Sequence, residues 1–253
     1  MTGNTDEGGG VLKYREGLYS TYVSKNTSHL YGEAGTDLFV RQFPVWKKYY
    51  TRLLPLDKSA RIIEIGCGSG GFLYCLKKFG YENSYGIDVS PEQIRIAKKL
   101  GMLNVECADV IDFLQDKKGI YDVIVIRDVI EHFTKNEILE MLRLMFSSLK
   151  QGGIVIIQTP NGESLFGGRI RYGDFTHEMS FTRKSLSHIL RVTGFGRLNF
   201  YPTGPVPYGI KSAIRFFFWK IIEMTIRFYM VVETGSGEGV YTQNIIAVAK
   251  NDV

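Results

Sequence analysis

Short apolar runs alternate along the chain with segments whose apolar residues recur every three or four positions. The runs are typical of buried strands and the wider spacing of amphipathic helices, so the alternation predicts βαβ units and a mainly parallel sheet. Strands are expected at 61–66, 84–89, 104–107, 121–126, 153–158, 196–201 and 241–250. Helices are expected at 70–79, after Ser90-Pro91, and at 110–114, 135–149 and 182–193. The pattern therefore predicts an α/β fold with seven strands.

An insertion at residues 203–240 precedes the last predicted strand and carries a strongly apolar helical pattern at 208–232. One face of this helix is uncharged, and the other holds a basic excess. The uncharged face could bind a membrane surface or a lipid carrier, or it could pack against the chain itself or a second copy in a homodimer. The uncharged face comprises Ile214, Phe217, Phe218, Ile221, Met224, Phe228 and Val231, and the charged residues are Lys211, Arg215, Lys220, Glu223 and Arg227.

A glycine-rich turn follows the first predicted strand, at residues 66–71. Such strand-to-helix turns hold nucleotide-like cofactors in α/β proteins. Gly66, Gly68 and Gly71 match the spacing of a dinucleotide site, whereas Glu64, Gly66, Gly68 and Gly70 match the pattern of methyltransferases. The turn by itself leaves both cofactor classes open.

Three further segments decide between these classes. They are Gly-Ile-Asp-Val-Ser at 86–90, Ala-Asp-Val at 108–110, and the segment 121–132, which ends in Glu131-His132. With the glycine turn, and over roughly residues 55–250, the sequence resembles the class I S-adenosylmethionine-dependent methyltransferases. The resemblance implies a Rossmann-like seven-stranded mixed sheet with one antiparallel strand in its final hairpin. It also implies S-adenosylmethionine as the cofactor.

The resemblance assigns cofactor contacts to residues at the carboxyl ends of the first four strands. Asp88 would accept hydrogen bonds from the ribose hydroxyls, Asp109 would lie near the adenine amino group, and Glu64 would position the methionine end. Helix capping or turn formation is the alternative role for the two aspartates. The complete predicted cofactor site is Glu64, Gly66, Cys67, Gly68, Gly70, Asp88, Val89, Asp109, Val110 and Arg127.

Two histidines are candidates for the general base that an alcohol acceptor needs. His132 resembles the Glu-His pair of quinone-biosynthesis and sugar O-methyltransferases. His177 lies in a segment, 174–182, that resembles one found in methyltransferases of bacterial surface-polysaccharide pathways. The predicted catalytic residues are His132, His177, Asp174 and Glu131. The alternative roles are anchoring of a loop by His132 and capping of the following helix by Asp174 and His177. No ligand spacing diagnostic of a metal is present, so no metal is expected.

Length and composition add boundaries to this interpretation. The 253 residues suit one domain, divided into a disordered tail at 1–10, an N-terminal helical lid at 11–54 and a methyltransferase domain at 55–250. The net charge of +5 is scattered, which disfavours nucleic-acid binding. The sequence has three cysteines without a disulfide or metal pattern, and it shows neither a signal peptide nor an apolar span. These features predict a cytoplasmic protein, which could also attach to the inner face of a membrane.

Three functions are compatible with these observations. The first is methyl transfer to a hydroxyl, with a small-molecule or glycan acceptor such as the sugar of a lipid-linked saccharide. The second is O-methylation of a quinone precursor or another lipid phenol. The third is non-catalytic binding of S-adenosylmethionine.

Overall fold

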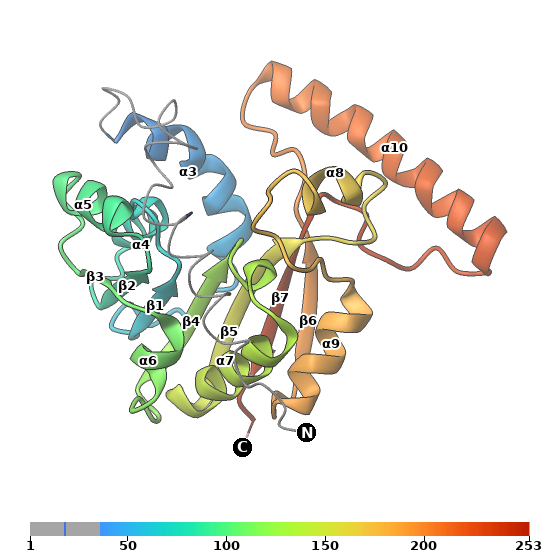
Figure 1. Cartoon of the computed structure of the whole chain (residues 1–253). Coiled ribbons are helices and arrows are strands. Elements are labelled where there is room, and N and C mark those ends of the chain that lie inside the picture. The colour runs from blue at the N-terminus through green and yellow to red at the C-terminus, as the bar shows by residue number, and fades with distance from the viewer. Residues whose placement is uncertain (1–17, 19–35, 253) are drawn as a thin grey trace, which may run out of the picture.

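The computed structural model describes Leu18 and residues 36–252 of the chain. Within these residues one sheet has the strand order β3-β2-β1-β4-β5-β7-β6 (Figure 1). β7 is antiparallel to both of its neighbours, and the other adjacent strands pair in parallel. The strands are β1 (Ile62–Ile65), β2 (Ser84–Asp88), β3 (Val105–Cys107), β4 (Tyr121–Arg127), β5 (Leu149–Pro160), β6 (Leu198–Pro202) and β7 (Asn244–Lys250). The predicted seven-stranded mixed sheet is confirmed.

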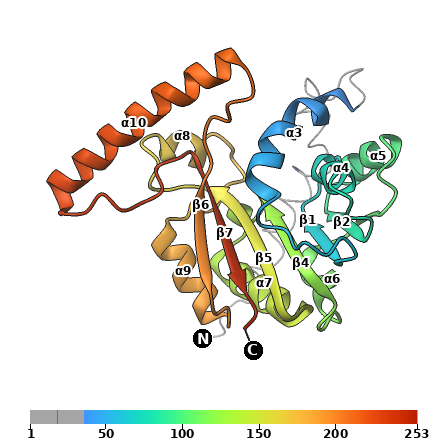
Figure 2. The same ribbon diagram turned by 180° about the vertical axis from the view of Figure 1, so that it is seen from behind.

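Helices cover both faces of the sheet, as Figures 1 and 2 show from opposite sides. One apolar cluster joins the sheet to α3 (Asp37–Tyr50), α4 (Gly71–Lys78) and α5 (Pro91–Lys99). A second cluster joins it to α6 (Val110–Leu114), α7 (Lys135–Ser148) and α9 (Arg183–Val192). The central strands are buried on both faces because successive side chains point into opposite clusters, which explains their unbroken apolar runs.

Local signals place several helices as the sequence predicts. Ser90 caps α5, where its hydroxyl accepts the backbone N–H of Gln93 at 3.4 Å and Pro91 occupies the first helical position. Thr134 and Glu137 form a capping box at the start of α7. The carboxyl ends of β1, β2 and β4 meet at one edge because β1 pairs in parallel with both of the other strands.

The predicted strand boundaries agree with the structure to within two residues, except at the starts of two strands. β5 begins at Leu149 instead of residue 153, because Leu149 pairs with Tyr121 across a register irregularity. β7 begins at Asn244 instead of residue 241, since the Nδ2 group of Asn161 donates to the carbonyls of Val240 and Thr242 and holds this segment in a turn. As predicted, β7 lies inside the sheet and is largely buried.

The predicted N-terminal segments lie mostly outside the described residues. The structure describes none of the predicted tail at 1–10, and of the predicted lid at 11–54 it describes Leu18 and residues 36–54. The described part contains α3, whose aromatic side chains pack on α4. The ring pairs are Phe39–Tyr74, Phe43–Phe79, Trp46–Phe72 and Tyr50–Phe72. The lid function of this region stays a prediction.

The insertion forms α10 (Ile210–Thr234), a helix of 25 residues. It runs past α8 (Gly167–Arg171) and projects from the molecule in both ribbon views (Figures 1 and 2). Its buried residues are Ser212 and Ile226, whereas the predicted apolar face is exposed. Packing of that face against the chain's own core is therefore wrong for the described residues. No described helix has both the length and the apolarity to cross a bilayer.

Candidate functional site

The turn between β1 and α4 has the backbone shape that its glycines allow. Gly66 and Gly68 have φ of +69° and +54°, in the left-handed region that other residues rarely adopt. A Cβ at Gly66 would lie 2.2 Å from Val129 Cγ2, so this glycine also fits against the segment after β4. At Gly68 the nearest protein atom to a Cβ would be 3.8 Å away. The backbone of Gly68 therefore borders space that a ligand can fill.

Asp88 connects this turn to the end of β2. One carboxylate oxygen accepts the backbone N–H of Gly68 and the other accepts that of Ser90, both at 2.8 Å. Burial raises the pKa of Asp88. The turn-forming role considered for Asp88 is present in the structure. Because a carboxylate has about four acceptor positions, these two bonds leave capacity for hydroxyl donors.

Glu64 and Arg127 form a buried ion pair at the ends of β1 and β4. The Arg127 Nε donates to Glu64 Oε1 at 3.2 Å, and Glu64 Oε2 is buried without a hydrogen-bond partner within the described chain. Burial raises the pKa of Glu64 to about 7, against the opposing effect of Arg127. The guanidinium lies 5.1 Å from the Trp46 ring and 4.7 Å from the Phe72 ring. This aromatic enclosure explains how a charged pair is kept inside the protein.

The remaining predicted cofactor residues follow β1, β2 and β3 near the same edge. Asp109 is exposed and caps α6, where its carboxylate accepts the Ile111 N–H at 2.7 Å. Val89 is half exposed, whereas Val110 belongs to the core. Cys67 is also buried, and burial raises the pKa of its thiol far above the usual range. The capping role considered for Asp109 is therefore present, and its contact with adenine stays a prediction.

These residues fit S-adenosylmethionine by their chemistry. The open side of Gly68 admits a ligand close to the backbone, the unpaired Glu64 Oε2 can accept from an ammonium group, and Asp88 retains acceptor capacity for a diol. A methionine ammonium and ribose hydroxyls supply such donors. Residues at the ends of two strands, β1 and β2, thus provide complementary groups for both halves of the cofactor.

A second group of polar residues follows β4 on the turn η2 (Ile130–His132), next to the glycine turn. Glu131 is fully buried, and its Oε2 accepts the Thr159 hydroxyl at 3.0 Å. Its Oε1 has no hydrogen-bond partner in the described part of the chain and lies 4.0 Å from His177 Nε2. Burial, followed by the charge of Asp128, raises the pKa of Glu131 well above its usual range.

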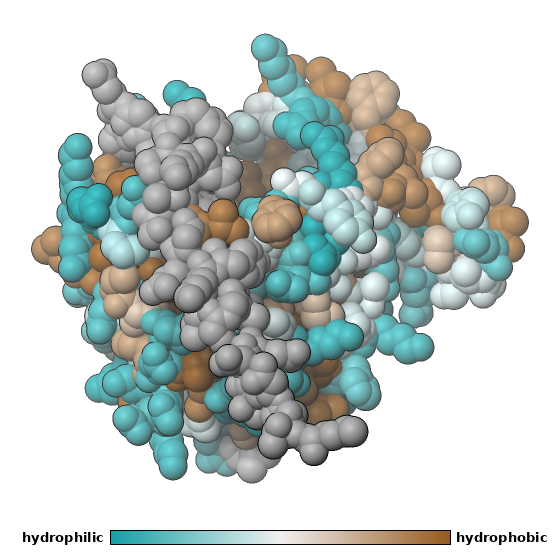
Figure 3. Space-filling view, viewed as in Figure 1, coloured by the Kyte–Doolittle hydropathy of each residue, from teal (hydrophilic) through white to brown (hydrophobic). Residues whose placement is uncertain are grey.

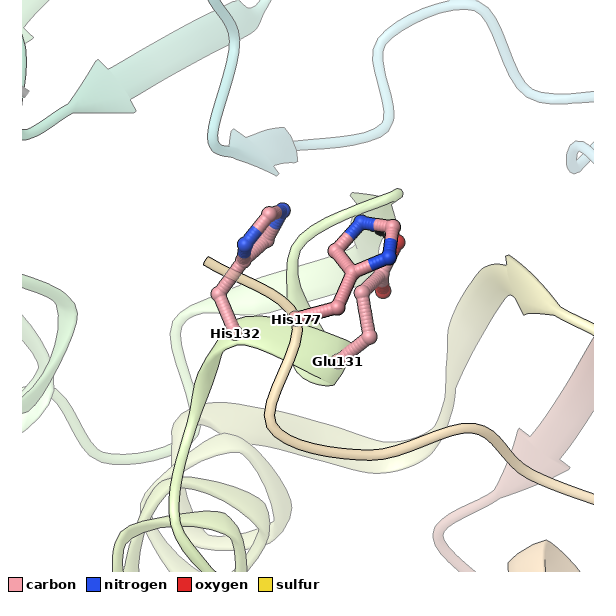
Figure 4. A group of neighbouring side chains, drawn as sticks. All are labelled: Glu131, His132 and His177. Atoms are coloured by element: carbon pink, nitrogen blue, oxygen red, sulfur yellow. Dashed lines mark ion pairs between the residues drawn. The ribbon is translucent and has the colours of Figure 1, made fainter. Parts of the chain in front are cut away.

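His177 reaches this group from the loop after α8, and its ring lies beside the Glu131 carboxylate and the His132 ring in Figure 4. Its Nδ1 lies 3.0 Å from the carbonyl of Ile170, which can only accept, so Nδ1 carries the proton. Nε2 is then the basic nitrogen of the neutral ring, and it faces Glu131 Oε1. The centres of the two histidine rings are 4.7 Å apart.

His132 is held by Thr176, which sequence reasoning did not single out. The Thr176 hydroxyl donates to Asp174 Oδ1 at 2.6 Å, so it accepts from the His132 Nδ1–H at 2.8 Å. Burial, with the nearby His177, lowers the pKa of His132 to about 4. Hydrogen bonds from Thr176 lower the pKa of Asp174, although burial opposes them. His132 is therefore neutral near pH 7 and hydrogen-bonded to this loop, and its role in catalysis stays a prediction.

The four predicted catalytic residues thus form one connected group. Asp174 does not cap α9, since Thr182 caps that helix. The ligating atoms of Glu131, His132 and His177 lie within 4.8 Å of one another, close enough for a metal, so the expectation of no metal stays a prediction. Thr159 and Thr176 complete the group, and a sequence signal existed for Thr176 alone, which lies inside the Asp174–His177 segment.

Two open cavities of about 360 and 320 Å³ lie elsewhere, at the amino ends of the strands. Arg61 and Tyr121 line the first, and Ser84 and Asn104 line the second. We assign the site to the carboxyl edge because the glycine turn and the unpaired buried carboxylate oxygens are there, and because ligands of parallel α/β sheets bind at that edge.

Comparison with known proteins adds evidence on the fold and the family. A solved S-adenosylmethionine-dependent methyltransferase from Archaeoglobus fulgidus is 22% identical with a TM-score of 0.61, over 94% of this chain and 98% of that one, which shows the fold. The O-methyltransferase 3 of Dictyostelium discoideum is 25% identical over 56% of this chain and 38% of its own length. The human EEF1A lysine methyltransferase 2 is 43% identical over 65 residues, which are 24% of this chain and 26% of that protein.

The matched segments therefore cover well under half the length of these two curated relatives. The methyltransferase domain family, by contrast, matches residues 39–197, which include the glycine turn, the end of β4 and the histidine loop. The resemblance noted in the sequence is confirmed at the level of family and fold. The chain belongs to the methyltransferase domain family.

Proposed function

We propose that the chain transfers the methyl group of S-adenosylmethionine to a hydroxyl, with His177 as the general base. The observation that carries this proposal is the position of the basic His177 nitrogen next to the buried Glu131, on a loop beside the glycine turn. Glu64, Gly68 and Asp88 would hold the cofactor. When bound, the cofactor supplies an electrophilic methyl group on a positively charged sulfur.

The proposed roles of the histidines follow from their hydrogen bonds. The Ile170 carbonyl fixes the His177 tautomer so that Nε2 can take the acceptor's proton. The resulting imidazolium would lie 4.0 Å from Glu131 Oε1, which can accept from it once ionised. His132, with a pKa of about 4, is a poor base at neutral pH and acts as a positioning residue for the loop.

The sugar of a glycan or lipid-linked saccharide is the acceptor class that we favour. The resemblance of the 174–182 segment to surface-polysaccharide methyltransferases supports a sugar, and the exposed apolar face of α10 supports an acceptor attached to lipid. The Dictyostelium relative is named as an O-methyltransferase, which agrees with a hydroxyl acceptor. A quinone precursor or another lipid phenol is the second candidate, supported by the same apolar face.

The test is transfer of labelled methyl from S-adenosylmethionine to sugar nucleotides, lipid-linked saccharides and lipid phenols. His177→Ala is expected to lower the transfer rate about 10²- to 10⁴-fold, the usual contribution of a general base. His188→Ala is the matched control, because His188 is exposed on α9. An unchanged rate in His177→Ala would remove the proposed base. Transfer to phenols and not to sugars would favour the second acceptor class.

Calorimetry with S-adenosylhomocysteine separates loss of chemistry from loss of cofactor binding. His177→Ala should bind this product as the wild type does, because His177 is not among the residues proposed to hold it. Failure of the wild type to bind the cofactor or its product would contradict the enzymatic proposal as a whole.

A further inference from the structure

The orientation of α10 is the reverse of that expected for a helix packed on its own domain. Its less exposed side holds the buried Ser212 and Ile226, and the half-buried Phe216, Trp219, Glu223, Arg227 and Met230. Arg227 pairs with Glu223 at 2.9 Å and donates to the carbonyls of Gly237 and Gly239 at 2.7 and 3.2 Å. The side that faces the protein therefore mixes apolar and polar residues, and the larger uncharged side of the helix faces outward.

The outward side forms a continuous uncharged stripe, which we name the outer face. At roughly 100° per residue, its members fall on one side of the helix. Each is more than two-fifths exposed, and Figure 3 shows hydrophobic residues gathered along α10. The outer face consists of Ile210, Ile214, Phe217, Phe218, Ile221, Met224, Phe228 and Val232. With 25 residues the helix is about 37 Å long. The exposed apolar area of the outer face is therefore continuous and larger than that of single apolar residues scattered on a surface.

The loop around α8 adds a second group of exposed apolar side chains. Leu165, Phe166, Tyr172 and Phe175 are 62, 74, 81 and 87% exposed, and both ribbon views place α8 beside α10. The same loop carries His177, two residues after Phe175. The exposed apolar surface is therefore adjacent in the chain to the proposed catalytic base.

The charges around the outer face indicate the partner. Lys211 and Arg215 border it on one side and Lys220 on the other, whereas the exposed half of the described helix has one acidic residue, Glu233, near its end. An apolar stripe with basic borders complements an anionic lipid surface, whose acyl region takes the phenylalanines and whose headgroups take the cations. A second copy would present the same basic excess and therefore less charge complementarity.

We propose that the outer face and the α8 loop bind the surface of an anionic membrane. The helix lies in the interface and does not cross it, consistent with the basic residues that border the outer face and with the hydropathy of the described helices. This attachment turns the carboxyl edge of the sheet toward the lipid headgroups. Resting on the proposed function, the inference further assigns to His177 an acceptor whose hydroxyl is presented at the membrane surface.

Cosedimentation of the full chain with vesicles tests the attachment without any methyl transfer. The wild type should bind vesicles of phosphatidylcholine with phosphatidylglycerol, and bind phosphatidylcholine alone more weakly. Phe217→Ser with Phe228→Ser should lower the partition coefficient at least about tenfold, because two exposed aromatic side chains lose their apolar burial. Lys211→Gln with Arg215→Gln should lower binding to the anionic vesicles and abolish part of its salt dependence.

Leu56→Ser with Leu103→Ser is the matched control, since these leucines are 96 and 76% exposed at the opposite edge of the sheet. This pair should leave vesicle binding unchanged, and calorimetry with S-adenosylhomocysteine should show that all variants fold.

Equal binding of the wild type and the phenylalanine variant, or no vesicle binding, would overturn the proposal. A wild-type dimer that becomes monomeric in the phenylalanine variant, without vesicle binding, would assign the outer face to a second copy. Vesicle binding by a protein that transfers no methyl group to lipid-linked acceptors would support the membrane attachment and contradict the proposed membrane-bound acceptor.

Discussion

Gly66 shows how one position can be fixed by both backbone and packing. Its φ of +69° disfavours any side chain, and a Cβ would overlap Val129 at 2.2 Å. Gly66→Ala should therefore lower the free energy of unfolding by about 2–4 kcal/mol, which combines left-handed strain with a forced shift of Val129. Urea unfolding measures this loss.

Gly119→Ala provides the control for backbone strain without a clash. Gly119 has φ of +59°, and no atom lies within 4 Å of its added Cβ. This substitution should cost about 1 kcal/mol. If both alanine variants lost the same stability, the contact with Val129 would not contribute, and the close fit between the two site segments would be contradicted.

The sequence identified residues whose signals are local. Glu64, Gly66 and Asp88 could be named because they follow apolar strands at fixed spacing. Thr159 could not, since its contact with Glu131 joins segments 28 residues apart and no spacing marks it. The different roles of the two histidines were also hidden, because Thr176 reaches His132 from 44 residues away and no spacing marks the Ile170 carbonyl as the partner of His177.

At the scale of elements, α3 shields the buried ion pair at the site. The Trp46 ring packs edge-on to Phe72 and lies 5.1 Å from the Arg127 guanidinium. Trp46→Ala should lower the free energy of unfolding by about 2 kcal/mol, below the 3–5 kcal/mol typical of fully buried aromatic residues, because Trp46 is half-buried. It should also weaken binding of S-adenosylhomocysteine, since water gains access to Arg127 and Glu64.

Val40→Ala is the control on the same helix, because Val40 is 53% exposed. Val40→Ala should change the free energy of unfolding and the binding free energy of S-adenosylhomocysteine by no more than about 0.5 kcal/mol each. Thermal unfolding and calorimetry on the two variants check the pair of expectations. An equal effect of both substitutions would mean that α3 contributes only its helix, and not the shielding of the ion pair.

The order and type of the elements could be predicted because strand and helix periods alternate regularly. Their ends were less predictable where tertiary contacts decide them, as at Leu149 and at Asn244. For α10 the sequence indicated an amphipathic helix but not which side meets the protein. The hydropathy pattern leaves that choice open, because Phe216, Trp219 and Met230 on the protein side are as apolar as the residues that face outward.

At the scale of the whole molecule, buried acids gather at the carboxyl edge of the sheet. Burial raises the pKa of Glu64, Asp88, Asp128 and Glu131. A carboxyl group whose pKa is higher in the folded than in the unfolded protein favours folding while it is protonated. That stability is present below the unfolded pKa and is lost as pH rises through the folded pKa. The protein is therefore expected to lose stability between mildly acidic and mildly alkaline pH.

Glu64 allows this expectation to be tested, since its folded pKa is about 7 against an ordinary value of 4.5. Its contribution should decline between about pH 5 and pH 8, by up to about 3 kcal/mol in the free energy of unfolding. Glu64→Gln cannot ionise, so urea unfolding at the two pH values should show a smaller decline than in the wild type, whatever the absolute stability of the variant. Glu82→Gln, at an exposed position, should retain the wild-type decline. A wild-type stability that stays constant or rises from pH 5 to pH 8, with the same profile in Glu64→Gln, would show that Arg127 keeps Glu64 ionised throughout. The cofactor's ammonium would then meet a permanently charged carboxylate and not one that loses its proton on binding.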